Sequence, residues 1–184
     1  MTLKFRIFAA AAFSLLAAPT AIADVWTVDP AQSTLAFEVQ QGDTALTGTF
    51  GTWSAAIDFD PNAPEKAQIS ASIQAASATT GNAQFDGTLP NADWFDVAAF
   101  PEAKFIASDV ERVEGNSYRA TGTLDIKGLS HPVVLDFKLD IDGDIAKASG
   151  TATLNRLDYN LGSGVATDTV SDAVSVTLDL TATR

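Results

Sequence analysis

Apolar and polar residues alternate with a period of two along most of the chain. This period is typical of β-strands with one buried face, because successive side chains of a strand point to opposite sides of a sheet. The pattern is clearest over residues 131–142, where Leu135, Phe137, Leu139 and Ile141 alternate with charged side chains. The chain therefore predicts sheet rather than helix.

Turn-forming residues divide this alternation into a series of antiparallel strands. Pro30, Asp60-Pro61 and Asp142-Gly143 are examples of such turns. The strands that the pattern predicts are 25–29, 33–40, 44–50, 52–59, 66–75, 104–110, 118–126, 131–142, 145–155 and 173–181. The alternation is lost for long only over residues 77–100, where we expect helix, coil or a lid.

Eight or more strands that are each apolar on one face must bury those faces together. A closed barrel does so and leaves no exposed strand edge, and a barrel of about eight strands has room for one slender ligand. The predicted fold is therefore all-β: an antiparallel β-barrel of about eight strands with a short helical or coil insertion near residues 81–100. A two-sheet sandwich would show the same alternation and remains the alternative.

Large aromatic side chains are concentrated at the end of that insertion. Trp94, Phe95, Phe100 and Phe105 all lie within residues 93–105. We expect these rings to fold against the sheet, where they either complete an ordinary core or line a ligand cavity. Asp93 and Asp96 are interpreted as caps of a short helix or as solvated surface residues, rather than as a catalytic pair of carboxylates.

The first 23 residues have the three parts of a secretory signal peptide. Lys4 and Arg6 form a basic region, residues 7–18 are apolar, and 21–23 are small-x-small residues before a cleavage point. A membrane anchor is disfavoured because Pro19 interrupts a run shorter than the roughly 20 apolar residues needed. The mature domain is predicted to span 24–184 and to be exported to the bacterial periplasm. With no cysteine, disulfides and a lipid-modified cysteine are excluded.

Charge limits the partners of this domain. The chain carries a net charge of −12. Lys4 and Arg6 are the two charged residues of the first 23, so residues 24–184 carry nine basic and 23 acidic side chains, a net charge of −14. Such a surface repels phosphate backbones and anionic headgroups. We expect no nucleic-acid partner and no stable membrane insertion, whereas a free outer barrel face is compatible with a homodimer.

Residues for catalysis or metal binding are scarce. His131 is the single histidine, lies at the start of a strand and is interpreted as structural or solvated. One histidine and no cysteine cannot build the usual zinc set. Residues 140–144 imitate half of a calcium loop, but Ile145 replaces the required glycine and Thr151 the bidentate glutamate. No glycine-rich phosphate loop is present, so we expect no cofactor, no metal and no enzyme activity.

Several motifs, taken together and in order, resemble the YceI-like family. They are Trp26-Thr27-Val28-Asp29 with Ser33 and Phe37, Gly48-Thr49-Phe50, Asp93 to Asp96 with Phe100-Pro101 and Phe105, Gly122-Thr123-Leu124 with Gly128 and Pro132 to Leu135, and Arg156 to Tyr159 with Gly162. The resemblance implies a lipocalin-like barrel, secreted to the periplasm, that binds a polyisoprenoid, a prenyl quinone or another long amphiphile for transport, storage or sequestration.

The chain departs from the family at one segment. Where many relatives carry a histidine, an Arg-Asp pair and a second histidine, this chain has Asn82, Phe85-Asp86 and Thr88. Neutral side chains thus replace three that are charged or titratable. If those groups meet a ligand headgroup in relatives, this chain favours a neutral quinone or lipid head over an anionic diphosphate.

Twelve residues are predicted to contact the ligand. The barrel wall contributes Leu35, Phe37, Ile73, Phe105, Leu124, Leu135 and Phe137, one end is closed by Phe85, Leu89, Trp94 and Phe95, and Arg156 lies at the mouth. Small interior candidates leave room for a guest: Ala71, Ala75 and Ala107.

Three alternatives to this interpretation remain. Arg156 either pairs with a carboxylate such as Asp158 or contacts a ligand head. A stress-related interaction protein with a filled core is the first rival to a lipid carrier. An enzyme acting on the lipid is the second, with Arg156, Asp158 and His131 as its only plausible reactive set.

Overall fold

A computed structural model describes residues 25–184, and the predicted signal peptide, residues 1–23, lies outside the described residues. Eleven strands of the described chain form one sheet in which every pair is antiparallel. They are β1 (Val25–Val28), β2 (Thr34–Gln41), β3 (Thr44–Phe50), β4 (Trp53–Asp58), β5 (Gln68–Gln74), β6 (Ala78–Thr79), β7 (Glu102–Glu114), β8 (Ser117–Ile126), β9 (Leu129–Asp142), β10 (Ile145–Asn155) and β11 (Val170–Thr183).

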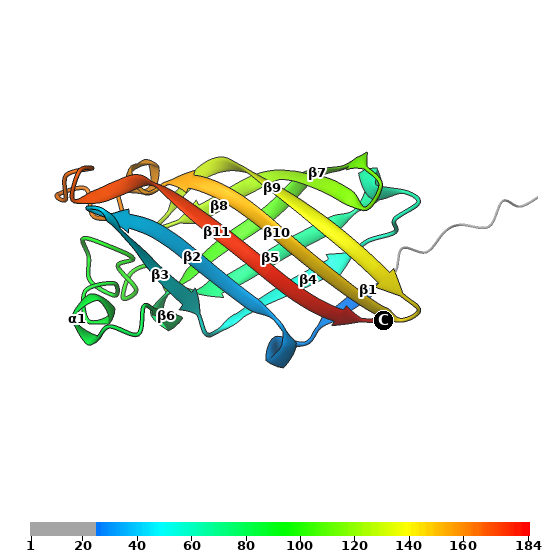
Figure 1. Ribbon diagram of the computed structural model, residues 1–184, viewed down its shortest axis with the longest axis horizontal. Helices are drawn as coiled ribbons and strands as arrows, with labels where there is room; N and C mark the ends of the chain where they lie inside the picture. Colours follow the sequence, from blue (N-terminus) through cyan, green and yellow to red (C-terminus); the bar gives the residue numbers. More distant parts are fainter. Residues whose placement is uncertain (1–24) are drawn as a thin grey trace, which may run out of the picture.

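The sheet closes into an eight-stranded barrel (Figure 1). Both β1 and β2 pair with β11. On the other side, β1 pairs with β4 and β2 pairs with β3. Next, β4 pairs with β5 and β3 pairs with β6. β1 with β2, β3 with β4, and β5 with β6 therefore each act as one bent barrel strand, and β7 to β11 supply the other five. The predicted barrel is confirmed, and the sandwich alternative is wrong.

Two strands extend by several residues beyond the ranges that the sequence pattern predicts. β7 extends from Glu102 to Glu114, and all four of its last residues are exposed. These residues pair with β8 but expose both of their own faces, so no alternation marks them. β11 begins at Val170, and an irregular register between Val170 and Val174 breaks the period of two there.

The insertion between β6 and β7 contains one helical turn, α1 (Ala83–Asp86), whose N-cap Asn82 accepts a hydrogen bond from the Gln84 amide. The chain then runs through successive turns as far as residue 100. Asp93 and Asp96 cap no helix within residues 25–184, and of the two alternatives for these carboxylates surface solvation fits Asp93, which is exposed. Asp96 has a left-handed backbone, with φ of 48°, which prevents a helix from continuing through it.

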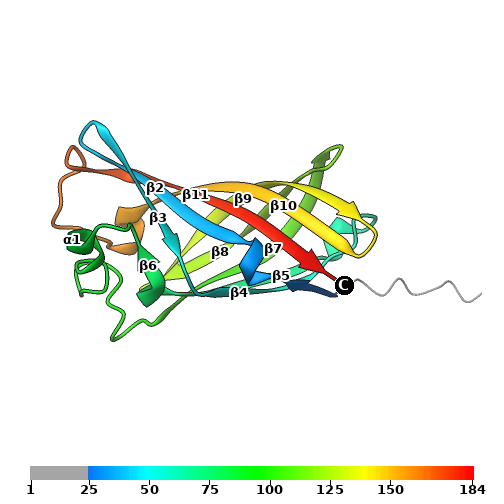
Figure 2. The ribbon, with the colours of Figure 1, turned by 60° about the horizontal axis from the view of Figure 1, so that its bottom comes forward.

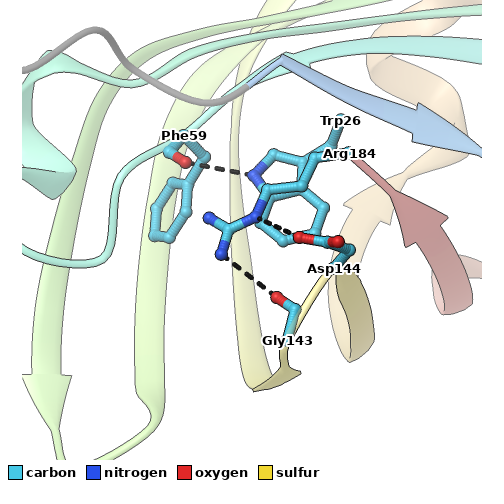
Figure 3. Close-up of polar contacts among 5 residues, drawn as sticks. All are labelled: Trp26, Phe59, Gly143, Asp144 and Arg184. Atoms are coloured by element: carbon cyan, nitrogen blue, oxygen red, sulfur yellow. Dashed lines mark hydrogen bonds and ion pairs between the residues drawn. The ribbon is translucent and has the colours of Figure 1, made fainter.

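The end of the barrel that holds the carboxyl terminus is sealed (Figure 3). Trp26, Phe59 and Tyr118 are all buried there. The Trp26 indole Nε1 donates a hydrogen bond of 3.1 Å to the Phe59 carbonyl. The Arg184 guanidinium lies 4.9 Å from the centre of the Trp26 ring and is hydrogen bonded to Gly143 and Asp144. The packed rings and the Arg184 guanidinium therefore close this end of the barrel.

Glycines opposite aromatic rings keep the interior open farther along the barrel. A Cβ at Gly48 on β3 would lie 2.3 Å from the Phe37 ring on β2. A Cβ at Gly122 on β8 would lie 2.6 Å from the Phe105 ring. Each ring therefore lies over a glycine of the neighbouring strand, in the space that a side chain would otherwise fill, instead of extending across the interior.

Candidate functional site

A cavity of about 490 Å³ occupies the barrel interior. Of the 36 residues that line it, 30 are apolar, and they come from every strand of the barrel except β1, β6 and the outer part of β7. The insertion with α1 and the segment between β10 and β11 lie together at one end, opposite the carboxyl terminus (Figures 1 and 2). The cavity volume is in the range of small-molecule pockets, roughly 300 to 1,000 Å³.

Eleven of the twelve residues predicted to contact a ligand line this one cavity. They are Leu35, Phe37, Ile73, Phe85, Leu89, Trp94, Phe95, Phe105, Leu124, Leu135 and Arg156. The strands bring together side chains up to 121 positions apart in the chain, from Leu35 to Arg156. The barrel is therefore not filled by its own side chains, contrary to the filled-core alternative.

Phe137 is the exception and does not line the cavity. Its ring stacks on the Tyr118 ring, with centroids 5.4 Å apart and an interplanar angle of 19°, at the sealed end. Alternation correctly places Phe137 on the inner face of β9, but it carries no information on depth along the barrel axis. Of the three interior alanines, Ala71 lines the cavity, while Ala75 and Ala107 do not.

The insertion covers the cavity with aromatic side chains. The Phe95 ring meets the Phe50 ring edge-on at a centroid distance of 6.0 Å. Trp94 lies against Gly162, whose amide donates a hydrogen bond of 2.6 Å to the Asp93 carbonyl. Phe100 instead packs on Gly128, outside the cavity lining. The second half of the insertion is thus fixed to the segment after β10.

Lys127 adds a second tie between these two segments. Its Nζ donates to the Ala92 carbonyl at 2.6 Å and to the Asn160 carbonyl at 3.3 Å. Because these acceptors belong to the insertion and to the segment after β10, one side chain joins both parts of the cover.

Polar lining residues gather at the end of the cavity near α1, which we call the mouth. They are Gln41, Thr80, Gln84, Thr88 and Thr169. The sequence singles out only Thr88, in the segment where the chain departs from the family. The other four were missed, because isolated polar residues at the ends of strands and in turns follow no period. Apart from Arg156, the described residues that line the cavity include no charged side chain and no histidine.

Asp86 holds the first half of the insertion against β6. Its carboxylate accepts hydrogen bonds from the Thr79 hydroxyl at 2.6 Å, the Thr80 amide at 2.6 Å and the Thr80 hydroxyl at 2.7 Å. The hydrogen bond from the Thr79 hydroxyl, followed by those from Thr80, lowers the pKa of Asp86. Asp86 is therefore a fixed anion beside the mouth.

Arg156 takes neither of the two roles considered for it. The side chain is buried, and all five of its N–H groups donate to backbone carbonyls at 2.7 to 3.1 Å. The acceptors are Leu161, Gly162, Val165, Val170 and Ser171. Asp158 instead accepts from the Asn155 amide at 3.4 Å. Arg156 thus organises the segment after β10 and has no donor left for a ligand head.

Tyr159 follows Arg156 in the same 3₁₀ helix (Arg156–Tyr159) and is 1% exposed. The His131 ring meets its ring edge-on at 5.1 Å. Burial, and to a lesser degree the charges of Asp158 and Asp125, raise the pKa of Tyr159 to about 12. The phenol is therefore protonated at physiological pH.

The three residues of the enzyme alternative do not converge on the large cavity. Only Arg156 lines it, whereas His131 and Asp158 border a separate cavity of about 120 Å³. Over residues 25–184 there is no cluster of three or more His, Cys, Asp or Glu side chains that could hold a metal ion. Within the same range, no helix is long and apolar enough to cross a membrane.

Comparison with known proteins finds the YceI-like domain over residues 26–182. A UPF0312 protein of Pseudomonas savastanoi pv. phaseolicola is 30% identical over 141 residues, covering 73% of each chain. A UPF0312 protein of Photorhabdus laumondii is 34% identical over 132 residues, covering 70% of this chain and 68% of the relative.

Solved structures share the fold. Burkholderia cenocepacia BcnA superposes with a TM-score of 0.80 at 29% identity, covering 85% of this chain and 99% of that one. The Campylobacter jejuni YCEI protein has a TM-score of 0.71 at 28% identity, covering 77% and 86%. A polyisoprenoid binding domain from Saccharophagus degradans has a TM-score of 0.69 at 18% identity, covering 86% and 97%, and at this identity shows a likeness of fold alone.

Proposed function

Because this chain belongs to the YceI-like family, we propose that it binds an isoprenoid lipid, or a similar long amphiphile, in its barrel. The observation that carries the proposal is the cavity of about 490 Å³ whose lining residues are apolar in 30 of 36 cases. The polyisoprenoid binding domain of Saccharophagus degradans has the same fold and adds support.

Burial of the tail supplies the binding free energy. Moving apolar carbon out of water contributes roughly 0.8 kcal/mol per CH₂. Each five-carbon unit then contributes on the order of 3 kcal/mol before the entropy of ordering the ligand is subtracted. A few isoprene units therefore suffice for useful affinity without any polar contact.

A neutral headgroup, such as that of a prenyl quinone, fits this chain better than a diphosphate. Arg156 is the only cation among the described lining residues, and its five donors are all engaged with carbonyls. The mouth offers amide and hydroxyl side chains, with the Asp86 carboxylate beside it. A diphosphate would meet no free cation here, and its own charge would be repelled by Asp86.

We further place this function in the periplasm, where the protein transports, stores or sequesters its lipid. The signal peptide expected over residues 1–23 supports export. Holding a lipid requires no chemical step, and the described cavity lining presents no histidine, lysine or carboxylate to it.

Titration with two matched probes tests the proposal. Trp53 and Trp94 line the cavity, so their fluorescence reports occupancy. A prenylated benzoquinone with four isoprene units should bind with a one-to-one stoichiometry and more tightly than the C20 prenyl diphosphate. Tighter binding of the diphosphate would refute the neutral-head proposal, and failure of both probes would refute isoprenoid binding.

A further inference from the structure

The barrel wall opens between β9 and β10 near the end that carries the mouth. Their ladder ends at the pair Ala152 and Leu135. β9 stays paired with β8 as far as Leu129, and β10 stays paired with β11 as far as Asn155. Two strand edges therefore face each other without a ladder, and Pro132, which has no N–H to donate, suits such an unpaired edge.

This opening holds the small cavity of about 120 Å³, which we call the slot. Its polar border comes from His131, Thr153, Asn155, Asp158 and Tyr159. At about 30 Å³ per water molecule, the slot has room for a polar group of a few heavy atoms.

The slot adjoins the large apolar cavity. Val133 and Leu154 line both spaces, so these two side chains form the boundary between them. The slot is therefore a polar space directly beside the large apolar cavity.

Tyr159 borders the slot, and its buried hydroxyl is a hydrogen-bond donor without a partner. Among buried side-chain N and O atoms of residues 25–184, two have no hydrogen bond: Asp58 Oδ1 and Tyr159 Oη. Asp58 lines neither cavity and its oxygen is an acceptor. A buried hydroxyl without a partner is costly, and native proteins rarely leave one unmatched.

The hydroxyls at the mouth are already used. Thr80 donates to Asp86, Thr88 to the Gln84 carbonyl and Thr169 to Asp168. A ligand head at the mouth would compete with these bonds and with solvent, because Gln84, Thr88 and Thr169 are exposed. The Tyr159 hydroxyl, by contrast, has no hydrogen bond to give up, although Thr153, Asn155 and Asp158 at the rim of the slot are exposed.

We propose that the slot is the headgroup site: a ligand whose tail fills the large cavity places a neutral carbonyl oxygen there, and the Tyr159 hydroxyl donates a hydrogen bond to it. The nearby Asp158 carboxylate disfavours an anionic head. This inference rests on the proposed function and adds to it the place and chemistry of head recognition.

The test compares two probes on three variants: Tyr159→Phe, Tyr118→Phe and Gln84→Leu. The probes are a prenylated benzoquinone with four isoprene units and the C20 prenyl hydrocarbon that lacks a head. Tyr159→Phe removes only the hydroxyl, and should weaken quinone binding by roughly fivefold to tenfold while leaving hydrocarbon binding unchanged. Tyr118→Phe makes the same chemical change at the sealed end, and should alter neither affinity.

Three results would overturn the proposal. Equal affinities of wild type and Tyr159→Phe for the quinone would show that the phenol does not contact the head. Equal losses for both probes would show that the hydroxyl only holds a structural water or the local packing. Loss of quinone affinity in Gln84→Leu, with none in Tyr159→Phe, would place the head at the mouth. If the wild type binds neither probe, the proposed function itself fails. That outcome differs from the three above, in which the wild type still binds the quinone.

Discussion

At the scale of single residues, Arg156 is a buried cation whose charge is spread over backbone carbonyls. Its five acceptors lie in residues 161–171, a stretch that closes the end of the barrel between β10 and β11. A guanidinium suits this role because its five N–H groups point in fixed directions within one plane. The residue is therefore the organiser of this segment.

Replacing Arg156 by lysine should destabilise the protein. A lysine ammonium has three donors, so at least two buried carbonyls lose their partner. We expect the free energy of unfolding to fall by roughly 2 to 4 kcal/mol, measured by urea denaturation. Arg119→Lys, at an exposed pair with Asp136, is the control and should cost much less, because exposed ion pairs contribute little to stability. Equal effects of the two substitutions would contradict the role given to Arg156.

Tyr159 should titrate far from the ordinary value of a phenol. Tyr118→Phe leaves Tyr159 as the one tyrosine of the chain, so ultraviolet absorbance follows it alone. Its pKa should be about 12. Because the folded-state pKa is raised above the unfolded value, the neutral phenol stabilises the fold up to about pH 10, and this contribution is lost between pH 10 and 12. Titration near pH 10 in the folded protein would show that Tyr159 is solvated.

The alternation in the sequence predicted whether a side chain faces the barrel interior better than it predicted how deep along the barrel that side chain lies. Alternation correctly set Phe37, Leu124 and Leu135 toward the interior. It also set Phe137 inward, but the depth of that ring depends on barrel tilt and on contact with Tyr118. The partners of Arg156 are backbone carbonyls, which every residue type carries, so no sequence motif could have indicated them.

At the scale of elements, the insertion between β6 and β7 has two differently held halves. The second half is tied by Lys127 and by the Gly162 amide. The first half, with α1, is tied to β6 through the carboxylate of Asp86. Since Gln84 and Phe85 of α1 line the cavity, this half borders the mouth.

Acid should loosen this first half. The pKa of Asp86 is lowered by its hydrogen bonds, so their contribution is present above about pH 4 and is lost as the pH falls through the folded-state pKa. Asp86→Ala should mimic this loss at neutral pH, with faster amide exchange at Thr80. Asp43→Ala, in the turn between β2 and β3, is the control. Unchanged exchange in Asp86→Ala would refute the tie.

A second prediction at this scale concerns Gly48, the glycine that lies under the Phe37 ring. Gly48→Ala should push the Phe37 ring or separate β3 from β6, because the new Cβ would lie 2.3 Å from the ring and 2.7 Å from the Thr79 carbonyl. We expect a loss of roughly 1 to 3 kcal/mol in stability and weaker uptake of the prenylated benzoquinone. Gly164→Ala has open space around the new Cβ and should change neither. A Gly48→Ala protein that matches wild type would contradict this account of the cavity wall.

Strands were predictable from the sequence, and the insertion was not. β3 and β10 begin and end where the alternation does, because the barrel buries one face of each throughout. The insertion lacks a period, so only its location and its short helical content could be expected. Its conformation depends on distant contacts such as Trp94 on Gly162.

At the scale of the whole molecule, the barrel is sealed at one end and lined for an apolar guest at the other. Trp26 and Arg184 close the sealed end, and the insertion covers the other (Figures 1 and 3). The net charge of −12 keeps such a protein apart from anionic surfaces. A lipid carried inside would therefore be separated from both water and membrane.

The most direct test of this account is native mass spectrometry of the protein purified from its own cells, followed by organic extraction of whatever it releases. We predict one neutral prenyl lipid per chain, with a quinone as the expected class. A protein that is empty, and that stays empty after incubation with a prenylated benzoquinone and with a prenyl hydrocarbon, would contradict the lipid-binding account.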